Sequence, residues 1–248
     1  MLQLSQVASI LALLQLSSSA ALSRPAFSRA STSTALAASE HCGDYDYVIL
    51  SGTPWIVYNM LYNAHMTVGT HAPISNPFKR PTLATGNPEV VWSSVTDIEY
   101  VESTNNVPKG YSFVGLTQNL EITISDISSI PASYAWTGTN ATDFKGNVCF
   151  DFMVSDTKGD STSTSAQELM LWLQYEGGQL PIGWEKRMLP DTQFDGSFEG
   201  DLKECFEALV ALSKFTNETY VNVGNAGTEF FYGDSILNAT LGLQIDLS

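Results

Sequence analysis

Short apolar runs alternate with clusters of turn residues along most of the chain. From Tyr47 onward, stretches of β-branched and aromatic residues are separated by Gly, Pro, Asn and Asp, a pattern typical of many short strands joined by turns. Strict alternation of apolar and polar positions is clearest over residues 120–124 and 237–247. We expect each of these two segments to be a strand that buries one face, with Leu247 as the last inward residue.

One segment has helical periodicity instead. Between Gly200 and Phe215 the apolar residues recur every three or four positions: Leu202, Cys205, Phe206, Leu209, Val210 and Leu212. Asp201 and Glu204 have the spacing of an N-terminal capping box. The sequence therefore predicts an all-β sandwich with one amphipathic helix, at about residues 201–214, packed on the outside of a sheet.

The N-terminal region has the composition of a targeting segment. An apolar run from Val7 to Leu16 is followed by small residues up to Ala21, so residues 1–21 are predicted to be a secretory signal peptide, although no basic residue follows Met1. The alternative is an unstructured or misassigned start. Residues 22–40 are rich in Ser, Ala and Thr and are predicted to be a disordered leader. Residues 41–248 should form a single domain.

Three glycosylation sequons, at Asn140, Asn217 and Asn238, agree with export of the protein. The expected location is therefore extracellular, with no membrane attachment once the signal is cleaved, and we expect a monomer.

Charge and cysteine content exclude several functions. The net charge of −15, with only 11 Lys and Arg, disfavours nucleic acid and anionic membranes as partners. A neutral polysaccharide meets no such repulsion. The three cysteines allow at most one disulfide, and no Cys/His spacing resembles a metal site. We expect neither a metal nor a cofactor.

Two predicted strands each carry a carboxylate on an unusual face. In Val148–Ser155, Asp151 shares its face with Cys149 and Met153, and in Glu168–Gln174, Glu168 shares its face with Met170 and Trp172. A solvent-exposed face would normally carry Thr, Lys and Ser. Inverting the faces would bury Glu168 among leucines, which costs more.

A third acid, Glu229, lies between Gly227-Thr228 and two phenylalanines. Carboxylates among aromatic and soft side chains suit a sugar cleft, because aromatic rings stack on pyranose faces and a partly desolvated acid has a raised pKa. Glycoside hydrolysis needs two such acids. Taken alone, a glutamate on a strand is more often an ordinary exposed residue than a catalytic one, and Asp151 could equally be a surface acid near a turn.

At these residues the chain resembles glycoside hydrolase family 12, secreted endoglucanases and xyloglucanases with a β-jelly-roll fold of two antiparallel sheets. The most specific match is Glu168-Leu-Met-Leu-Trp-Leu173 followed by Pro181-Ile-Gly183, which resembles the family's nucleophile strand and its loop. Gly227-Thr-Glu-Phe-Phe231 resembles the acid/base motif Gly-Thr-Glu-Pro-Phe. Further matches, in the family's order, are Cys42-Gly-Asp-Tyr-Asp46, Tyr58–Asn63, Ile130–Trp136, Phe150-Asp151 and Gly200-Asp-Leu-Lys203.

The resemblance implies an endo-β-1,4-glucanase acting on cellulose-like β-glucan or xyloglucan. Glu168 would be the nucleophile, Glu229 the general acid/base, and Asp151 a neighbour that hydrogen-bonds and tunes the nucleophile. The carboxyl groups would lie about 5 to 5.5 Å apart and the anomeric configuration would be retained. Side chains expected to bind substrate are Asn59, Tyr62, Met170, Trp172, Pro181 and Phe231.

Several departures from the family pattern leave a second hypothesis open. The motif Asn-Asn-Leu-Trp-Gly has Met60 for its second Asn and Tyr62 for its Trp, and Cys42 has no nearby partner cysteine. The segment from Gly183 to Gly200 is short by roughly two strands, so either the sheet is trimmed near the cleft or coding sequence is missing. The alternative is a weakened or inactive secreted paralog that binds glucan or a host protein.

Overall fold

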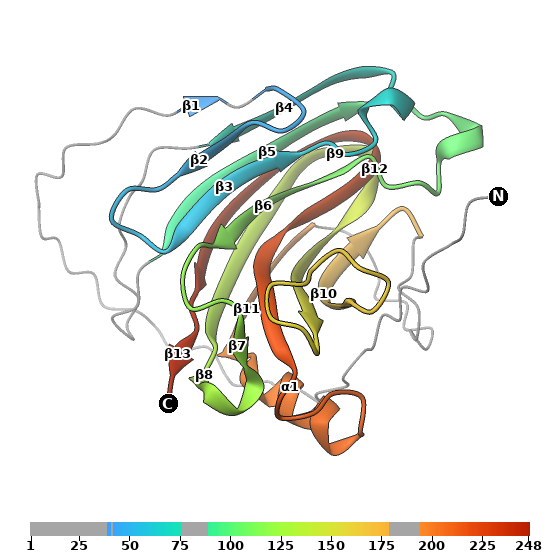
Figure 1. Ribbon diagram of the computed structural model, residues 1–248. Helices are drawn as coiled ribbons and strands as arrows, with labels where there is room; N and C mark the ends of the chain where they lie inside the picture. Colours follow the sequence, from blue (N-terminus) through green and yellow to red (C-terminus); the bar gives the residue numbers. More distant parts are fainter. Residues whose placement is uncertain (1–38, 41, 76–88, 179–193) are drawn as a thin grey trace, which may run out of the picture.

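Two antiparallel sheets pack face to face and share their two longest strands. The computed structural model describes residues 39–40, 42–75, 89–178 and 194–248. The predicted signal peptide and nearly all of the leader lie outside this range. Strands dominate these residues and a single α-helix accompanies them, so the predicted all-β sandwich is confirmed (Figure 1).

The inner sheet is curved and carries the acids. Its strands follow the order β2-β3-β6-β12-β9-β10, all antiparallel. Their bounds are Tyr47–Ile49 for β2, Trp55–Met60 for β3, Gly110–Leu116 for β6, Tyr220–Leu243 for β12, Pro131–Ser155 for β9 and Gln167–Glu176 for β10. Only the first part of β12 and the second part of β9 belong to this sheet, and the short β7 (Ile122–Thr123) also pairs with β12.

The outer sheet contains the other parts of the two long strands. Its order is β1-β4-β5-β12-β9-β11, again antiparallel. The bounds are Ser39–Glu40 for β1, Gly69–Ser75 for β4, Val90–Ile98 for β5 and Asp195–Asp201 for β11. A separate pair joins β8 (Ile127–Ser129) to β13 (Asp246–Leu247), and single 3-10 turns cover Ala64–Met66, Glu102–Thr104 and Ile124–Asp126.

The long strands pass from one sheet to the other at a set of bulges. The register between β9 and β12 shifts repeatedly between Phe230 and Ile236, and such bulges bend a strand. Gly233 lies within this region with a φ of 94°. A Cβ there would come within 2.5 Å of the Asp143 carbonyl oxygen, so the bend needs glycine.

Inward-facing residues of both sheets form the main core. Val148, Phe150, Phe152 and Val154 are buried in it, as the alternation of β9 predicts. Opposite them on β12, every second residue from Leu237 to Leu243 is buried, as is Ile245. Among the described residues, no helix is long and apolar enough to span a membrane.

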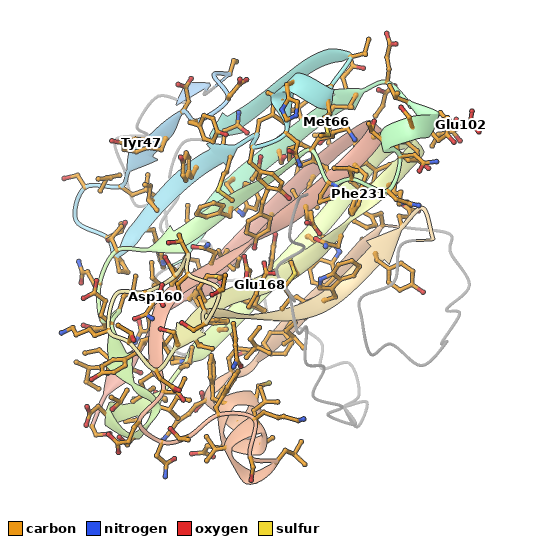
Figure 2. All side chains as sticks on the ribbon, turned by 45° about the vertical axis from the view of Figure 1, so that its right-hand side comes forward. Tyr47, Met66, Glu102, Asp160, Glu168 and Phe231 are labelled. Carbon is orange, nitrogen blue, oxygen red and sulfur yellow. The ribbon has the colours of Figure 1, made fainter. Side chains whose placement is uncertain are left out.

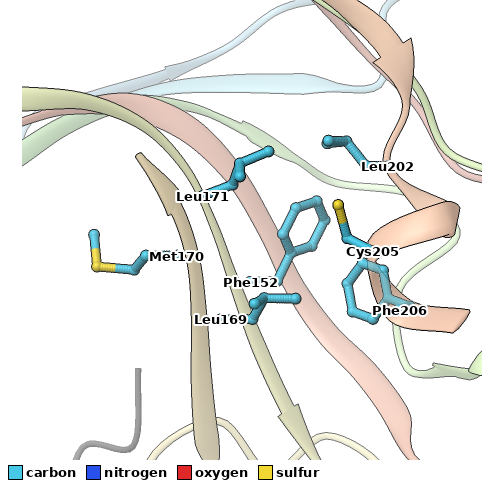
Figure 3. A pocket seen from close by; sticks show the side chains of 7 residues that line it. All are labelled: Phe152, Leu169, Met170, Leu171, Leu202, Cys205 and Phe206. Atoms are coloured by element: carbon cyan, nitrogen blue, oxygen red, sulfur yellow. The ribbon is translucent and has the colours of Figure 1, made fainter. Parts of the chain in front are cut away.

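Helix α1 (Lys203–Ala211) covers one end of this core. Phe206 packs edge to face on Phe152, with ring centroids 5.2 Å apart. A small apolar pocket remains between the helix and the sheet, lined by Phe152, Leu169, Met170, Leu171, Leu202, Cys205 and Phe206 (Figure 3).

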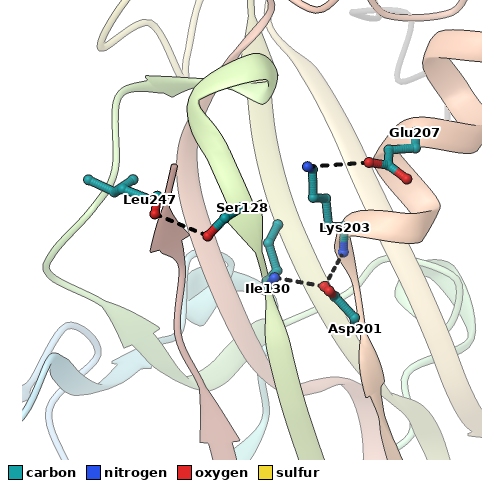
Figure 4. Close-up of polar contacts among 6 residues, drawn as sticks. All are labelled: Ser128, Ile130, Asp201, Lys203, Glu207 and Leu247. Carbon is teal, nitrogen blue, oxygen red and sulfur yellow. Dashed lines mark hydrogen bonds and ion pairs between the residues drawn. The ribbon is translucent and has the colours of Figure 1, made fainter.

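The helix begins two residues later and ends earlier than the periodicity suggests. Asp201 belongs to β11, and its Oδ1 accepts hydrogen bonds from the backbone N–H of Ile130 (2.7 Å) and of Lys203 (2.9 Å), so it joins the helix start to β9 instead of closing a capping box with Glu204 (Figure 4). Lys203 forms an ion pair with Glu207 at 3.3 Å. Leu212 lies beyond the last turn and is 64% exposed, so it is not part of the buried stripe.

Two strand predictions need correction. Residues 120–124 do not form one continuous strand with alternating burial. Glu121 has a φ of 60° and a 3-10 turn begins at Ile124, so only the two residues of β7 are a strand. Leu247 is 46% exposed. It lies in β13, beyond the end of β12, so it no longer follows the inward face of that strand.

Candidate active site

Three carboxylates share the concave face of the inner sheet. Asp151 on β9 lies opposite Asn225 of β12 on one side and Met170 of β10 on the other. Alternation along each strand then places Glu229 of β12 and Glu168 of β10 on this same face. Segments far apart in sequence thus meet because β9 lies between β10 and β12. Figure 2 shows Glu168 along the curved sheet, with Phe231 nearer the end that carries Met66 and Glu102.

Glu229 is held by two hydrogen bonds, one to each carboxyl oxygen. The Tyr62 hydroxyl lies 3.3 Å from Oε1, and the Asn147 Nδ2 donates to Oε2 at 3.0 Å. The Glu229 backbone N–H in turn donates to Asn147 Oδ1 at 3.0 Å. Asn147 is completely buried, so a side-chain amide within the sheet holds this carboxyl group in place.

The pKa of Glu229 is raised from 4.5 to about 7. Burial of the carboxyl group is the largest cause, and the nearby charge of Glu168 is the second. The hydrogen bonds from Tyr62 and Asn147 act in the opposite direction and lower the pKa. Burial and like charge therefore outweigh hydrogen bonding, and Glu229 keeps a proton under mildly acidic conditions.

The pKa values of the other two acids are raised as well. Burial raises the pKa of Glu168. For Asp151, which is 8% exposed, burial is the main cause of a strongly raised pKa, followed by the charges of Glu168 and Glu229. Oδ1 of Asp151 has no hydrogen-bond partner among the described residues.

Aromatic rings line the concave face beside the acids. Tyr58 of β3 contacts Tyr47 of β2 and Phe113 of β6 edge to face, and Phe113 stacks on Tyr111 with centroids 5.2 Å apart. Tyr111 is directly opposite Glu229 in the sheet. Buried Tyr111, Phe113 and Cys149 form a layer beneath half-buried side chains, namely Tyr58, Met60, Tyr62, Met170 and Trp172.

The expected substrate-binding residues have different environments. Met170 and Trp172 are half-buried on the face of Glu168, and the Trp172 Nε1 lies 3.5 Å from the Met170 sulfur. Phe231 is buried, with the Lys145 ammonium 5.1 Å above its ring. Tyr62 contacts Glu229, and Pro181 lies outside the described residues.

Asn59 does not belong to the concave face. Its side chain is 1% exposed, it donates to the Gly43 carbonyl at 2.8 Å, and it accepts from the Ser112 hydroxyl at 3.4 Å. Alternation along β3 directs Tyr58 and Met60 to the concave side and Asn59 to the other. We therefore remove Asn59 from the substrate-binding set.

Asn147 is the site residue that the sequence analysis missed. It lies four positions before Asp151 on β9, so the same alternation that grouped Cys149, Asp151 and Met153 would have included it. No group of three or more metal-ligating side chains occurs in the described part of the chain. The chemistry available is that of paired carboxyl groups with different proton affinities.

Comparison with known proteins agrees with this geometry. The family model for glycosyl hydrolase family 12 matches residues 53–196, more than half of the 248 residues. A probable xyloglucan-specific endo-beta-1,4-glucanase A from Aspergillus niger is 26% identical, with 92% of this chain and 93% of the relative covered. Endoglucanase A from Aspergillus kawachii is 37% identical over 50% of this chain and 63% of the relative.

Solved structures share the fold. Endoglucanase 3 from Trichoderma harzianum superposes with a TM-score of 0.70 at 20% identity, covering 84% of this chain and 98% of that one. The catalytic domain of Humicola grisea Cel12A gives 0.66 at 21%, covering 84% and 99%. The family model, which matches more than half of the chain, and the similar relatives show that the chain is a glycoside hydrolase and belongs to glycosyl hydrolase family 12.

Proposed function

We propose that the protein is a secreted, retaining endo-β-1,4-glucanase that cleaves internal linkages of xyloglucan or cellulose-like β-glucan. The observation that carries this proposal is the shared concave face of Glu168 and Glu229, with the charge of Glu168 helping to raise the pKa of Glu229 to about 7. One proton is then held by Glu229 while Glu168 ionises, which is the division of roles that glycosidases need.

In the first step, the Glu168 carboxylate attacks the anomeric carbon and forms a glycosyl ester. The bond from that carbon to the leaving oxygen breaks, and Glu229 gives its proton to that oxygen. In the second step, Glu229 takes a proton from water, the water oxygen attacks the anomeric carbon, and Glu168 leaves as a carboxylate. Two inversions at one carbon give net retention.

Asp151 contributes through its proton. Buried between Glu168 and Glu229, it would add a third negative charge if ionised, and its raised pKa disfavours that ionisation. A neutral Asp151 can donate a hydrogen bond to Glu168 when the nucleophile carries its charge. We propose this as the way in which Asp151 tunes the nucleophile.

The substrate class is proposed from the lining of the concave face. Tyr47, Tyr58, Met170 and Trp172 offer apolar planes and soft surface to sugar rings. The net charge of −15 imposes no penalty on a neutral glucan. Relatives named xyloglucan-specific endoglucanases cover most of the chain, so we include xyloglucan alongside linear glucan.

The test is release of reducing ends from xyloglucan, barley β-glucan and carboxymethylcellulose. Wild-type protein should act on at least one of them, and E168Q and E229Q should each lose at least about 10³-fold in activity. E204Q is the matched control, because Glu204 is an exposed glutamate on helix α1, and this helix packs against the core-facing side chains of β9 and β10, on the side of the sheet opposite to Glu168.

A wild-type protein that folds and releases no reducing ends from any of the three glucans would contradict the proposal. Binding without cleavage would then favour the non-catalytic alternative. Export is tested separately: Asn217 and Asn238 are exposed, and a secreted eukaryotic product should lose mass on enzymatic removal of N-glycans.

A further inference from the structure

Tyr62 and Asn147 divide the two oxygens of the Glu229 carboxyl group between them. The Asn147 Nδ2 faces Oε2, and the Tyr62 hydroxyl faces Oε1. The orientation of the Asn147 amide is set by its other end, because Oδ1 accepts from the Glu229 backbone N–H at 3.0 Å and from the Cys149 sulfur at 3.4 Å. A flipped amide would place Nδ2 against two donors.

This fixed amide decides which oxygen of Glu229 carries the proton. Nδ2 can only donate a hydrogen bond, so Oε2 must accept and is the poorer place for a proton. A tyrosine hydroxyl can donate or accept. Oε1 can therefore carry the proton and donate a hydrogen bond to the Tyr62 hydroxyl in the free enzyme. Once the proton has been transferred, the same hydroxyl can donate a hydrogen bond to Oε1.

We propose that Tyr62 is a positioning residue that keeps the transferable proton of Glu229 on Oε1 and holds that oxygen toward the leaving group. This inference rests on the proposed function. It replaces the expected role of Tyr62 as a sugar-stacking side chain. It also distinguishes this chain from the motif it resembles, since a Trp at this position offers only an N–H donor and could not accept the proton from Oε1.

The surroundings of Tyr62 suit this role. Burial and the charge of Glu229 raise the pKa of the Tyr62 hydroxyl, so it stays neutral through the working range of an acid/base near pH 7. The hydrogen bond that Tyr62 donates lowers the pKa of Glu229, whereas burial and the charge of Glu168 raise it. Removing the hydroxyl should therefore raise the pKa of Glu229 further and leave its proton without an acceptor.

The test compares Y62F with wild-type protein on two substrates. On a natural glucan, kcat should fall by about 10-fold or more while KM changes by less than roughly 3-fold. On a 2,4-dinitrophenyl β-cellobioside, whose leaving group needs little protonation, the loss should shrink to less than about 3-fold. In the pH profile of kcat/KM, the basic limb should shift to higher pH by roughly 0.5 to 1 unit. Y45F, which removes the hydroxyl of an exposed tyrosine, is the control.

A rise in KM with equal losses on both substrates would overturn the inference in favour of sugar stacking. An unmoved basic limb would also overturn it. An independent readout is the titration of the Glu229 carboxyl carbon by NMR, assigned with E229Q: an unchanged pKa in Y62F overturns the inference. If wild-type protein has no glucanase activity, the proposed function fails and the positioning role fails with it. If it is active and Y62F behaves like wild-type on both substrates, only the inference fails.

Discussion

At the scale of single residues, burial outweighs hydrogen bonding for the acids of the concave face. Asp151 and Glu229 both have raised pKa values, and in both cases burial is the first cause and neighbouring carboxylates the next. Grouping of Asp151 and Glu168 with soft side chains could be predicted from alternation along their strands. Their pKa values could not, because these depend on β9 lying between β10 and β12.

The raised pKa of Glu229 makes the stability of the protein depend on pH. A carboxyl group whose pKa is higher in the folded state contributes stability below its unfolded value and loses it as pH rises through the folded value. For Glu229 the window runs from about 4.5 to about 7. The free energy of unfolding should therefore fall across that window, by roughly 1 to 3 kcal/mol from this group.

Urea denaturation of wild-type, E229Q and E204Q proteins at pH 4.5, 5.5, 6.5 and 7.5 measures this effect. E229Q should show a smaller decline than wild-type, and E204Q should follow wild-type. A decline of equal size in E229Q would mean that the Glu229 pKa is not raised.

At the scale of elements, helix α1 shows that apolar periodicity predicts the buried positions of a helix but not its bounds. Cys205, Phe206 and Leu209 are buried as the apolar spacing requires, but the helix starts later because Asp201 is bound to the Ile130 N–H of a distant strand. The same limit applies to residues 120–124, where backbone conformations at Asn119 and Glu121 override an alternating pattern. Asn59 is a third case, since motif position suggested substrate binding and strand alternation places its side chain elsewhere.

Helix packing is tested by a matched pair of leucines. Leu209 is 0% exposed within the core and Leu212 is 64% exposed after the last turn. L209A should reduce the free energy of unfolding by about 2 to 5 kcal/mol through the cavity it leaves, and L212A should change it by less than about 0.5 kcal/mol. Chemical denaturation of both variants gives the two values; equal effects would contradict the helix packing.

At the scale of the whole molecule, two strands that run through both sheets assemble the site. β9 and β12 pair along nearly their full length and bring Asp151 and Glu229 together, while β10 adds Glu168 at the side of β9. Sequence patterns predicted the sandwich and the strands, and the family resemblance implied the acids. Strand order, register and the fixed amide of Asn147 depend on non-local pairing, which no local pattern contains.

The central claim is that Glu168 attacks the sugar while Glu229 supplies the proton. The most direct measurement is covalent trapping with an activated 2-deoxy-2-fluoro cellobioside, followed by mass spectrometry of the digested protein. The account predicts one added fluoroglycosyl group on the peptide that contains Glu168, and none in E168Q. A label on a different residue, or active enzyme that acquires no label, would contradict it.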